Sequence, residues 1–169
     1  MVGKALKEMR KSEGLTQEQL ALEFNLSKSM ISEIEKGNRK LQEDVAHHSL
    51  KNLDNPLYAL DIVHEFSDGY TAPRLSGNAV EWHRLALEEF VLKETSEVIQ
   101  ILKDVSLVKS PEASNLEELK QVEKVIGELI DAETAIGNLK AILADEYKLS
   151  LKECHKNRSE QYKKNGWIE

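Results

Sequence analysis

The chain has 169 residues, of which 31% are charged and 40% hydrophobic, and its net charge is −7. This length suits one medium-sized domain or two small ones, and the composition fits a soluble globular protein. A membrane-spanning helix is not expected, because the chain has no run of about 18 apolar residues. The N-terminal residues lack the apolar stretch of a secretory signal, and the single cysteine excludes an internal disulfide. We therefore expect a cytoplasmic protein.

The charges are unevenly distributed along the chain. Residues 1–40 carry eight Lys and Arg against six Asp and Glu, and residues 151–169 carry five against three, which leaves residues 41–150 with a net charge of −11. An acidic centre argues against nucleic-acid binding by those residues, but it allows a small basic DNA-binding part at one end. The chain is rich in Leu, Glu, Lys and Ala and poor in aromatic residues, which favours helices over strands.

The first helix is expected from about residue 3 to residue 13. Ala5, Leu6 and Met9 share one face at this spacing. Gly14 follows, at the position where a left-handed C-terminal cap favours glycine.

A second helix is expected to begin after Thr16. Thr16 and Gln19 have the spacing of a capping box, and Leu15 and Leu20 have the spacing of a hydrophobic staple. The helix is expected to be short and to end near Phe24.

The third helix repeats this pattern, with Leu26 before the cap, Ser27 at the cap and Ile31 at the staple position. Gly37 is expected to end it. Two short helices separated by about three residues have the geometry of a helix-turn-helix.

Two further helices are expected at 42–53 and 56–66, the second beginning at Pro56, which is well suited to a first helical turn. Residues 67–78 contain two glycines, a proline and small polar residues, which predicts a linker or structured loop. The first domain is therefore predicted at 1–66.

Two long helices are expected at 79–109 and 111–150, separated where Pro111 pushes its predecessor out of helical geometry. In the second, apolar residues recur every seven positions, at Val122, Leu129, Ile136 and Leu143, with Val125, Ala132 and Leu139 three residues later. This pattern predicts either self-association through a coiled-coil-like seam or an intramolecular helical core. We assign 79–150 to oligomerisation, through Val122, Val125, Leu129, Ile136, Leu139 and Leu143, and treat 151–169 as a basic C-terminal tail.

Residues 15–40 resemble the helix-turn-helix of the phage repressor and Cro class, the XRE family. The matching positions are Leu15-Thr16-Gln17, Leu20-Ala21, Leu26-Ser27, Ile31-Ser32, Ile34-Glu35 and Gly37. The resemblance is close over about 26 residues and looser over about 65. It implies an all-α fold in which a λ-repressor-like five-helix domain precedes the long helices, arranged as a helical hairpin or coiled coil.

The third helix is the predicted recognition helix. Near its N-terminal end the solvent-facing side chains are Lys28, Ser29, Ser32 and Glu33, which we expect to contact base edges in the major groove. Lys28 can donate to guanine, Glu33 can accept from cytosine, and serine can do either. The resemblance implies phosphate contacts by Gln17, Lys36, Asn38, Arg39 and Lys40.

Two acidic residues stand beside this predicted surface. Glu33 and Glu35 both add negative charge to the third helix. Glu35 is usual in the family, and Arg10 of the first helix is its candidate partner.

The sequence thus predicts a sequence-specific DNA-binding transcription regulator. The resemblance implies a repressor of phage, prophage or mobile-element origin, acting on double-stranded DNA as a homodimer or homotetramer at a symmetric operator. A protein or peptide antagonist is a further candidate partner. The alternative is an interaction adaptor, in which the helix-turn-helix or the acidic helical region binds a protein.

Neither an enzyme nor a metal protein is expected. His47 and His48 are adjacent and point about 100° apart on a helix, so they chelate poorly. Cys154 and His155 have the same defect and lack partners at zinc-ligand spacing. The chain contains no phosphate-binding loop or nucleophile motif, and no cofactor is expected.

Overall fold

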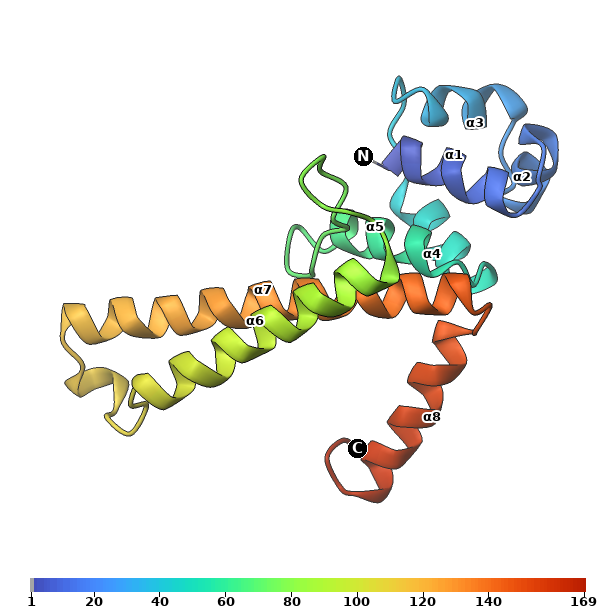
Figure 1. Cartoon of the computed structure of the whole chain (residues 1–169). Helices are drawn as coiled ribbons and strands as arrows, with labels where there is room; N and C mark the ends of the chain where they lie inside the picture. The colour runs from blue at the N-terminus through green and yellow to red at the C-terminus, as the bar shows by residue number, and fades with distance from the viewer. Residues whose placement is uncertain (1) are drawn as a thin grey trace. The chain divides into compact units, whose positions relative to one another are not determined.

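A computed structural model describes residues 2–169, and these residues form helices and no strand (Figure 1). The predicted all-α fold class is therefore confirmed. The helices are α1 (Val2–Ser12), α2 (Gln17–Glu23), α3 (Lys28–Glu35), α4 (Glu43–Asn52), α5 (Pro56–Phe66), α6 (Arg84–Asp104), the 3-10 helix η1 (Pro111–Ala113), α7 (Leu116–Glu146) and α8 (Leu151–Lys164).

The chain divides into two compact units. The first, unit 1, contains the residues up to Pro73 together with Ala141–Glu169, and the second, unit 2, contains Arg74–Lys140. The last turns of α7 and all of α8 therefore group with the N-terminal helices, whereas the sequence-based boundaries placed 79–150 together. The functional domains predicted at 1–66 and 79–150 stay a prediction.

The predicted helix caps of unit 1 are present. The Thr16 hydroxyl accepts a hydrogen bond from the Gln19 backbone N–H (3.1 Å), and the Gln19 side chain accepts one from the Thr16 backbone N–H (2.8 Å). The Ser27 hydroxyl accepts from the Met30 backbone N–H (3.2 Å). Each cap satisfies a donor that the first turn of a helix leaves unpaired, which fixes where α2 and α3 begin.

The core of unit 1 is formed by the apolar faces of its first five helices. Helix α1 contacts α3 and α5, α2 contacts α3, and α4 contacts α5. The buried side chains are Ala5, Leu6, Met9, Leu20, Ala21, Phe24, Ile31, Ile34, Leu41, Val45, Ala46, Tyr58 and Ile62. Because Leu20 and Ala21 of α2 lie in this core with Ile31 and Ile34 of α3, packing fixes the angle between α2 and α3.

The start of α1 approaches α3 backbone to backbone. A Cβ atom added to Gly3 would lie only 2.0 Å from the carbonyl oxygen of Ile34. Only glycine allows this separation, so Gly3 determines how closely α1 and the end of α3 pack.

Unit 2 contains an antiparallel helical hairpin of α6 and most of α7 (Figure 1). The first long helix begins at Arg84 and ends at Asp104, so the prediction of 79–109 was too long at both ends. The second begins at Leu116 rather than 111, where the Asn115 side chain accepts hydrogen bonds from two backbone N–H groups of the first turn. It ends at Glu146 rather than 150, and Lys148 then adopts a left-handed backbone conformation (φ 54°).

The hairpin buries a line of side chains spaced by seven residues on α6, namely Leu87, Glu94 and Ile101. Helix α7 buries Val125, Ala132, Ala135 and Asn138. No helix among residues 2–169 is long and apolar enough to cross a membrane.

The segment before α6 is held on unit 2 by polar contacts. The Leu75 backbone N–H donates to the side-chain oxygen of the fully buried Asn138 (2.9 Å). The Arg74 guanidinium lies 5.4 Å from the centre of the Trp82 ring. Arg74 and Leu75 of the predicted 67–78 segment therefore contact unit 2, and the linker at 67–78 stays a prediction.

Candidate nucleic-acid interface

Helices α2 and α3 are joined by a tight turn with Asn25 at its centre. Asn25 has a left-handed backbone conformation (φ 52°), which asparagine tolerates better than most residues. The Leu26 backbone N–H donates to the Ala21 carbonyl (2.8 Å) and closes the turn. The helix-turn-helix geometry predicted from the sequence is therefore formed.

The four predicted base-contacting residues lie at the accessible face of α3. Lys28 and Ser29 are exposed, and Ser32 and Glu33 are partly exposed. Residues at the start of a recognition helix enter the major groove first. The structure therefore leaves these side chains accessible to a ligand, and their contacts with bases stay a prediction.

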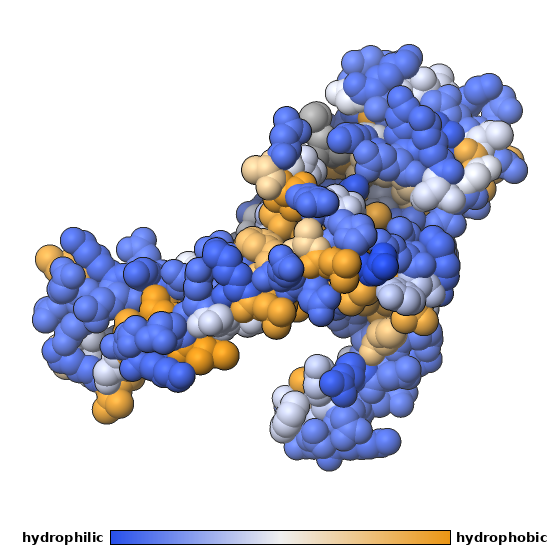
Figure 2. Space-filling model, in the orientation of Figure 1, coloured by the Kyte–Doolittle hydropathy of each residue, from blue (hydrophilic) through white to orange (hydrophobic). Residues whose placement is uncertain are grey.

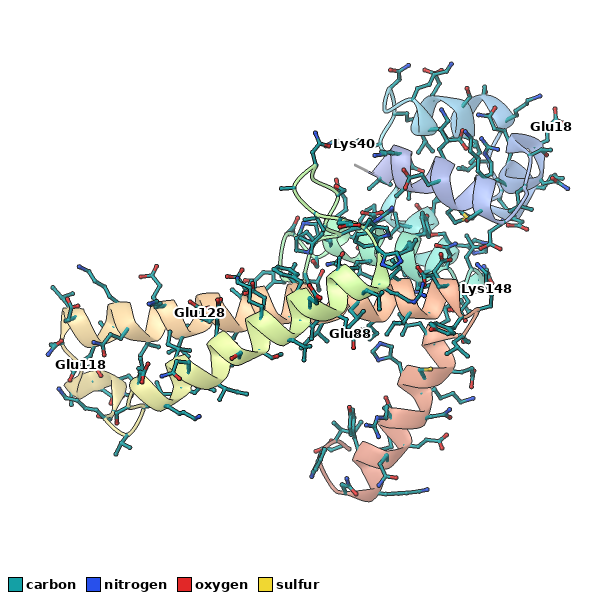
Figure 3. The ribbon with its side chains drawn as sticks, viewed as in Figure 1. Glu18, Lys40, Glu88, Glu118, Glu128 and Lys148 are labelled. Carbon is teal, nitrogen blue, oxygen red and sulfur yellow. The ribbon has the colours of Figure 1, made fainter. Side chains whose placement is uncertain are left out.

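Lys28 is paired with an acidic residue of the neighbouring helix. Its ammonium group donates to the Glu18 carboxylate at 2.6 Å, and Glu18 lies at the outer edge of α2 (Figure 3). This hydrogen bond, and then the charge of Lys28, lower the pKa of Glu18. Both side chains are exposed, so the pair is weak and Lys28 can exchange Glu18 for another acceptor.

Glu33 organises the turn that follows α3. Its carboxylate accepts hydrogen bonds from the Asn38 amide (3.0 Å) and the Lys36 ammonium (3.1 Å). Its backbone carbonyl accepts from the backbone N–H groups of Asn38 (3.0 Å) and Arg39 (3.2 Å). The hydrogen bonds from Asn38 and then Lys36 lower the pKa of Glu33. Of the predicted phosphate-contacting residues after α3, Lys36 and Asn38 thus bind the Glu33 carboxylate, and Arg39 binds the Glu33 backbone carbonyl.

The same turn presents its basic side chains to solvent. Lys36, Asn38, Arg39 and Lys40 are all exposed, and Gly37 adopts a left-handed conformation (φ 79°) that directs the chain away from α3. An exposed basic turn at the end of a recognition helix suits contact with the sugar–phosphate backbone.

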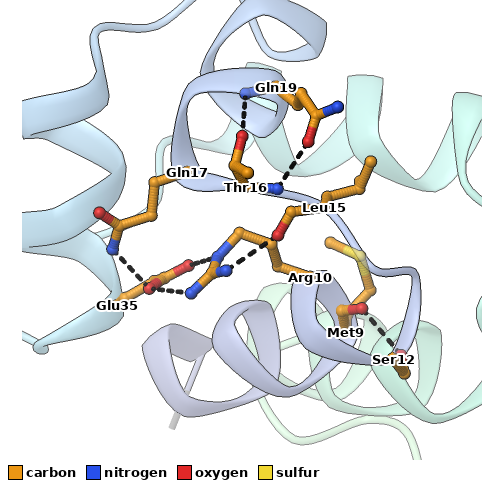
Figure 4. Close-up of polar contacts among 8 residues, drawn as sticks. All are labelled: Met9, Arg10, Ser12, Leu15, Thr16, Gln17, Gln19 and Glu35. Atoms are coloured by element: carbon orange, nitrogen blue, oxygen red, sulfur yellow. Dashed lines mark hydrogen bonds and ion pairs between the residues drawn. The ribbon is translucent and has the colours of Figure 1, made fainter.

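Gln17, the fifth predicted phosphate contact, has a structural partner that the sequence did not predict. Its amide N–H donates to the Glu35 carboxylate at 2.8 Å, and the Arg10 guanidinium donates to both oxygens of that carboxylate (Figure 4). The predicted Arg10–Glu35 pair is confirmed. Arg10 also donates to the Leu15 carbonyl (2.9 Å), which ties α1 to the start of α2.

The Glu35 carboxylate is ionised in this environment. Its burial by itself raises the pKa, but the hydrogen bonds from Arg10 and then Gln17, with the charge of Arg10, outweigh that effect, so the pKa lies below its ordinary value. Its side chain is 3% exposed and that of Arg10 is 13% exposed. The pair is therefore part of the framework on which α3 is positioned.

The predicted oligomerisation residues fall into two groups. Val125 is buried within its own chain, and Val122 and Leu139 are partly buried. Leu129, Ile136 and Leu143 are 44%, 45% and 36% exposed. One line of the seven-residue pattern therefore packs within the chain, and the other remains accessible.

Three acidic side chains meet on the hairpin of unit 2. Carboxylate oxygens of Glu94, Glu128 and Asp131 lie within 4.8 Å of one another. Glu94 is buried and accepts a hydrogen bond from Lys93 at 2.8 Å, which raises the pKa of Lys93. The lysine partly neutralises the group.

Residues 6–46 match a family model described as Helix-turn-helix. The match extends from α1 to the first residues of α4 and contains every predicted DNA-contacting residue. No curated protein and no solved structure matches the chain. The match confirms the resemblance found in the sequence.

Proposed function

We propose that this DNA-binding transcription regulator, whose N-terminal domain is a helix-turn-helix of the XRE family, is a repressor that binds a symmetric operator as an oligomer. The main support for this proposal is that the side chains of α3 and of the turn after it are accessible to solvent. Lys28 stands at one end of this surface and Arg39 and Lys40 at the other. A polar recognition helix with basic residues around it suits base contact in the major groove and phosphate contact beside it.

Base recognition is assigned to Lys28, Ser29, Ser32 and Glu33, and phosphate contact to Gln17, Lys36, Asn38, Arg39 and Lys40. In the free chain Lys28 is bound to Glu18, and Lys36 and Asn38 are bound to Glu33. DNA binding replaces these weak exposed contacts with bases and phosphates. The acidic side chains thus hold the basic ones in place and discourage binding to an unsuitable sequence.

Oligomeric binding follows from the geometry of recognition. One helix-turn-helix reads a half-site of a few base pairs, and two half-sites about one helical turn apart require two copies related by a two-fold axis. Repression follows when such a complex occupies DNA that the transcription machinery needs. The family resemblance suggests a phage, prophage or other mobile element as the source.

The test begins with selection of duplexes from random-sequence DNA by the full chain. We expect one enriched motif with two-fold symmetry. Binding to the selected duplex should weaken steeply as salt rises, because phosphate contacts release counterions. Arg39→Ala combined with Lys40→Ala should weaken binding to all sequences and flatten the salt dependence. Lys156→Ala, which removes an exposed lysine of α8, is the matched control and should leave binding unchanged.

The alternative is a protein-interaction adaptor, which the net charge of −11 over residues 41–150 favours. Failure of the selection to enrich any motif would contradict the repressor and favour the adaptor. An enriched motif without two-fold symmetry would support DNA recognition by this chain but would contradict binding to a symmetric operator.

A further inference from the structure

The start of α1 lies beside a hollow in unit 1. The hollow has a volume of about 770 Å³ and is lined by residues 2–4, 34–37, 39–41, 43, 65, 66 and 68. These residues belong to the start of α1, the end of α3 with the turn after it, the start of α4 and the end of α5. We call it the α1 hollow. Pockets of about 300–1,000 Å³ hold small organic ligands, so its size suits such a ligand.

The α1 hollow contains apolar side chains that a ligand can cover. Ile34 and Leu41 line it from the buried core, Val2 is half-buried, and Phe66 is 39% exposed. Figure 2 shows mainly hydrophilic side chains over the part of the chain that α1, α2 and α3 form. Apolar contact with a ligand is therefore favoured inside the hollow.

The turn after α3 supplies basic groups to the α1 hollow. Lys36 is bound to Glu33 (3.1 Å). Arg39 and Lys40 line the hollow and are exposed, and their side chains form no ion pair with another residue among residues 2–169. A guanidinium group binds a carboxylate through two parallel hydrogen bonds. This side of the hollow therefore suits the carboxylate of a ligand.

The end of α5 supplies acidic groups to the α1 hollow. Glu65 lies in the last turn of α5 and Asp68 lies two residues after the helix. Both are exposed, and neither forms an ion pair in the described part of the chain. The negative end of the helix dipole disfavours carboxylates at this end of a helix. A bound cation would relieve that repulsion, so this side of the hollow suits an ammonium group.

The charges that line the α1 hollow are balanced. The basic lining residues are Lys4, Lys36, Arg39 and Lys40, and the acidic ones are Glu35, Glu43, Glu65 and Asp68. Glu35 is neutralised by Arg10, and Glu43 lies in the first turn of α4, where the helix dipole favours a carboxylate. A ligand with charges of one sign would meet opposing charges in the hollow. A ligand with one charge of each sign is complementary to it.

The two charged sides are separated by the start of α1. Helix α1 contacts both α3 and α5 and lies between them (Figure 1). Axes of packed helices are about 8–10 Å apart, so a ligand needs charges separated by roughly that distance to reach both sides. A free amino acid has its two charged groups on one carbon atom and is too short. An extended peptide of three residues spans about 10 Å.

We propose that the α1 hollow binds a short peptide with two free ends and apolar side chains between them. The peptide carboxylate binds Arg39 and Lys40. The peptide ammonium group binds Glu65 and Asp68, and an apolar side chain covers Phe66.

The bound peptide acts as an antagonist of DNA binding. Arg39 and Lys40 are also the proposed phosphate contacts, so one molecule of the chain cannot offer them to a peptide carboxylate and to DNA together. This consequence rests on the proposed function, and it goes further by giving the antagonist a chemical class and a site.

The first experiment measures peptide binding to the full chain by calorimetry in the absence of DNA. The probe is the tripeptide Leu-Phe-Leu with free ends, compared with its N-acetylated form, its C-terminal amide and Gly-Gly-Gly. We expect the acetylated and amidated forms to bind about fivefold more weakly, since each lacks one exposed ion pair. Gly-Gly-Gly should bind more weakly because it lacks apolar side chains. The proposal is overturned if Leu-Phe-Leu does not bind at millimolar concentration, or if all four peptides bind equally.

Variants of the chain assign each end of the peptide. Arg39→Gln combined with Lys40→Gln should make the free and amidated peptides bind equally and preserve the effect of acetylation. Glu65→Gln combined with Asp68→Asn should make the free and acetylated peptides bind equally and preserve the effect of amidation. If both differences persisted in both double variants, the peptide would bind elsewhere and the proposal would be wrong.

Glu23→Gln combined with Lys51→Gln is the matched control. It removes one charge of each sign from exposed positions outside the α1 hollow. This variant should bind the four peptides as the wild type does. Loss of both differences in this control would show that they report the net charges of the chain, and would contradict the proposed site.

Competition with DNA tests the antagonism. Leu-Phe-Leu should weaken binding of the full chain to its selected duplex, and higher peptide concentration should be needed when more duplex is present. Simultaneous binding of peptide and duplex without loss of affinity would overturn the antagonism. These results are separable from those of the proposed function. A chain that binds the peptide as expected but enriches no DNA motif would support the hollow and contradict the repressor. A chain that enriches a motif but binds no peptide would contradict the hollow alone.

Discussion

Arg10 of α1 and Glu35 of α3 are joined by two hydrogen bonds between guanidinium and carboxylate, 25 residues apart in sequence. Gln17 of α2 donates a third hydrogen bond to the same carboxylate. The side chain of Glu35 thus joins three helices at one point, immediately before the basic turn that follows α3. The orientation of that turn therefore depends on a charged group that is almost fully buried.

The Arg10–Glu35 pair should make the stability of the chain depend on pH in the acidic range. The pKa of Glu35 is lower in the folded chain than in the unfolded chain. Its contribution to the free energy of unfolding is therefore present above the unfolded pKa, and it is lost as pH falls through the folded pKa. Glu35→Gln should be less stable than wild type at pH 7 by about 3 kcal/mol, because it breaks a buried pair. The difference should shrink when urea denaturation is repeated below about pH 4.

Glu8→Gln is the matched control for that measurement. Glu8 pairs with Lys4 at 3.7 Å, and the two side chains are 43% and 69% exposed. An exposed pair contributes little, so this variant should follow the wild-type pH profile. If Glu35→Gln and Glu8→Gln gave the same profile, the Arg10–Glu35 pair would not be a major source of stability.

Gly3→Ala should destabilise the chain although alanine is a better helix former than glycine. The new Cβ would meet the Ile34 carbonyl oxygen at 2.0 Å, so α1 must move away from α3. Overpacking of this kind costs about 1–3 kcal/mol, and it should be visible as a lower midpoint in thermal unfolding. Gly127→Ala provides the comparison, because its Cβ would meet nothing within 4 Å in the middle of α7. That variant should be stabilised by up to about 1 kcal/mol. A neutral or stabilising Gly3→Ala would contradict the close approach.

The local features of the helix-turn-helix were predictable from the sequence because they depend on neighbouring residues. The capping box of Thr16 and Gln19 and the cap at Ser27 were predicted from spacing alone, and the structure confirms them. Contacts such as Glu18 with Lys28, and Glu33 with Asn38, were not predicted. Each depends on how two helices, or a helix and a turn, are placed in three dimensions, and no short spacing rule encodes that placement.

The seven-residue pattern of α7 illustrates an ambiguity of another kind. A core within one chain and an interface between two chains both select aliphatic residues at this spacing. The structure shows that Val125 packs within its own chain, whereas Leu129 and Ile136 remain accessible for contact with another chain.

The ends of α6 were predicted wrongly for a simpler reason. The apolar pattern continues past Asp104 to Val105 and Val108, and the pattern alone does not mark where the helix stops.

Tyr58 should ionise at a higher pH than a tyrosine side chain in water. It is 2% exposed, and its hydroxyl shares a 2.8 Å hydrogen bond with that of Ser49. Burial raises its pKa to about 12, against a smaller lowering effect of Ser49. A phenol whose pKa is raised on folding stabilises the chain below its unfolded pKa, and that stability is lost between about pH 10 and 12. Ultraviolet titration should therefore show a late tyrosine ionisation that coincides with unfolding of the chain.

Tyr58→Phe should remove this late step and lower the free energy of unfolding by about 1 kcal/mol at neutral pH. Ser49 retains its hydrogen bond to the Ala46 carbonyl (2.7 Å), so no hydroxyl is left without an acceptor. A tyrosine that still titrates late in the Tyr58→Phe variant would show that a different residue is responsible.

Glu33 distinguishes a base contact from a structural contact on the recognition helix. If it accepts from cytosine in the complex, Glu33→Gln should shift the preferred base at one position of each half-site toward adenine, because glutamine pairs with adenine in the major groove. The change in discrimination should be about 1–3 kcal/mol at that position. Lys36→Ala, which removes a partner of Glu33 in the turn, should weaken binding to every sequence equally. Competition binding against a set of half-site DNA sequences measures both effects.

The contrary outcome is a Glu33→Gln protein that loses affinity equally for all of these DNA sequences. That result is expected if the substitution only removes the contacts of Glu33 with Lys36 and Asn38. Glu33 would then position the phosphate-contacting turn and would not contact a base.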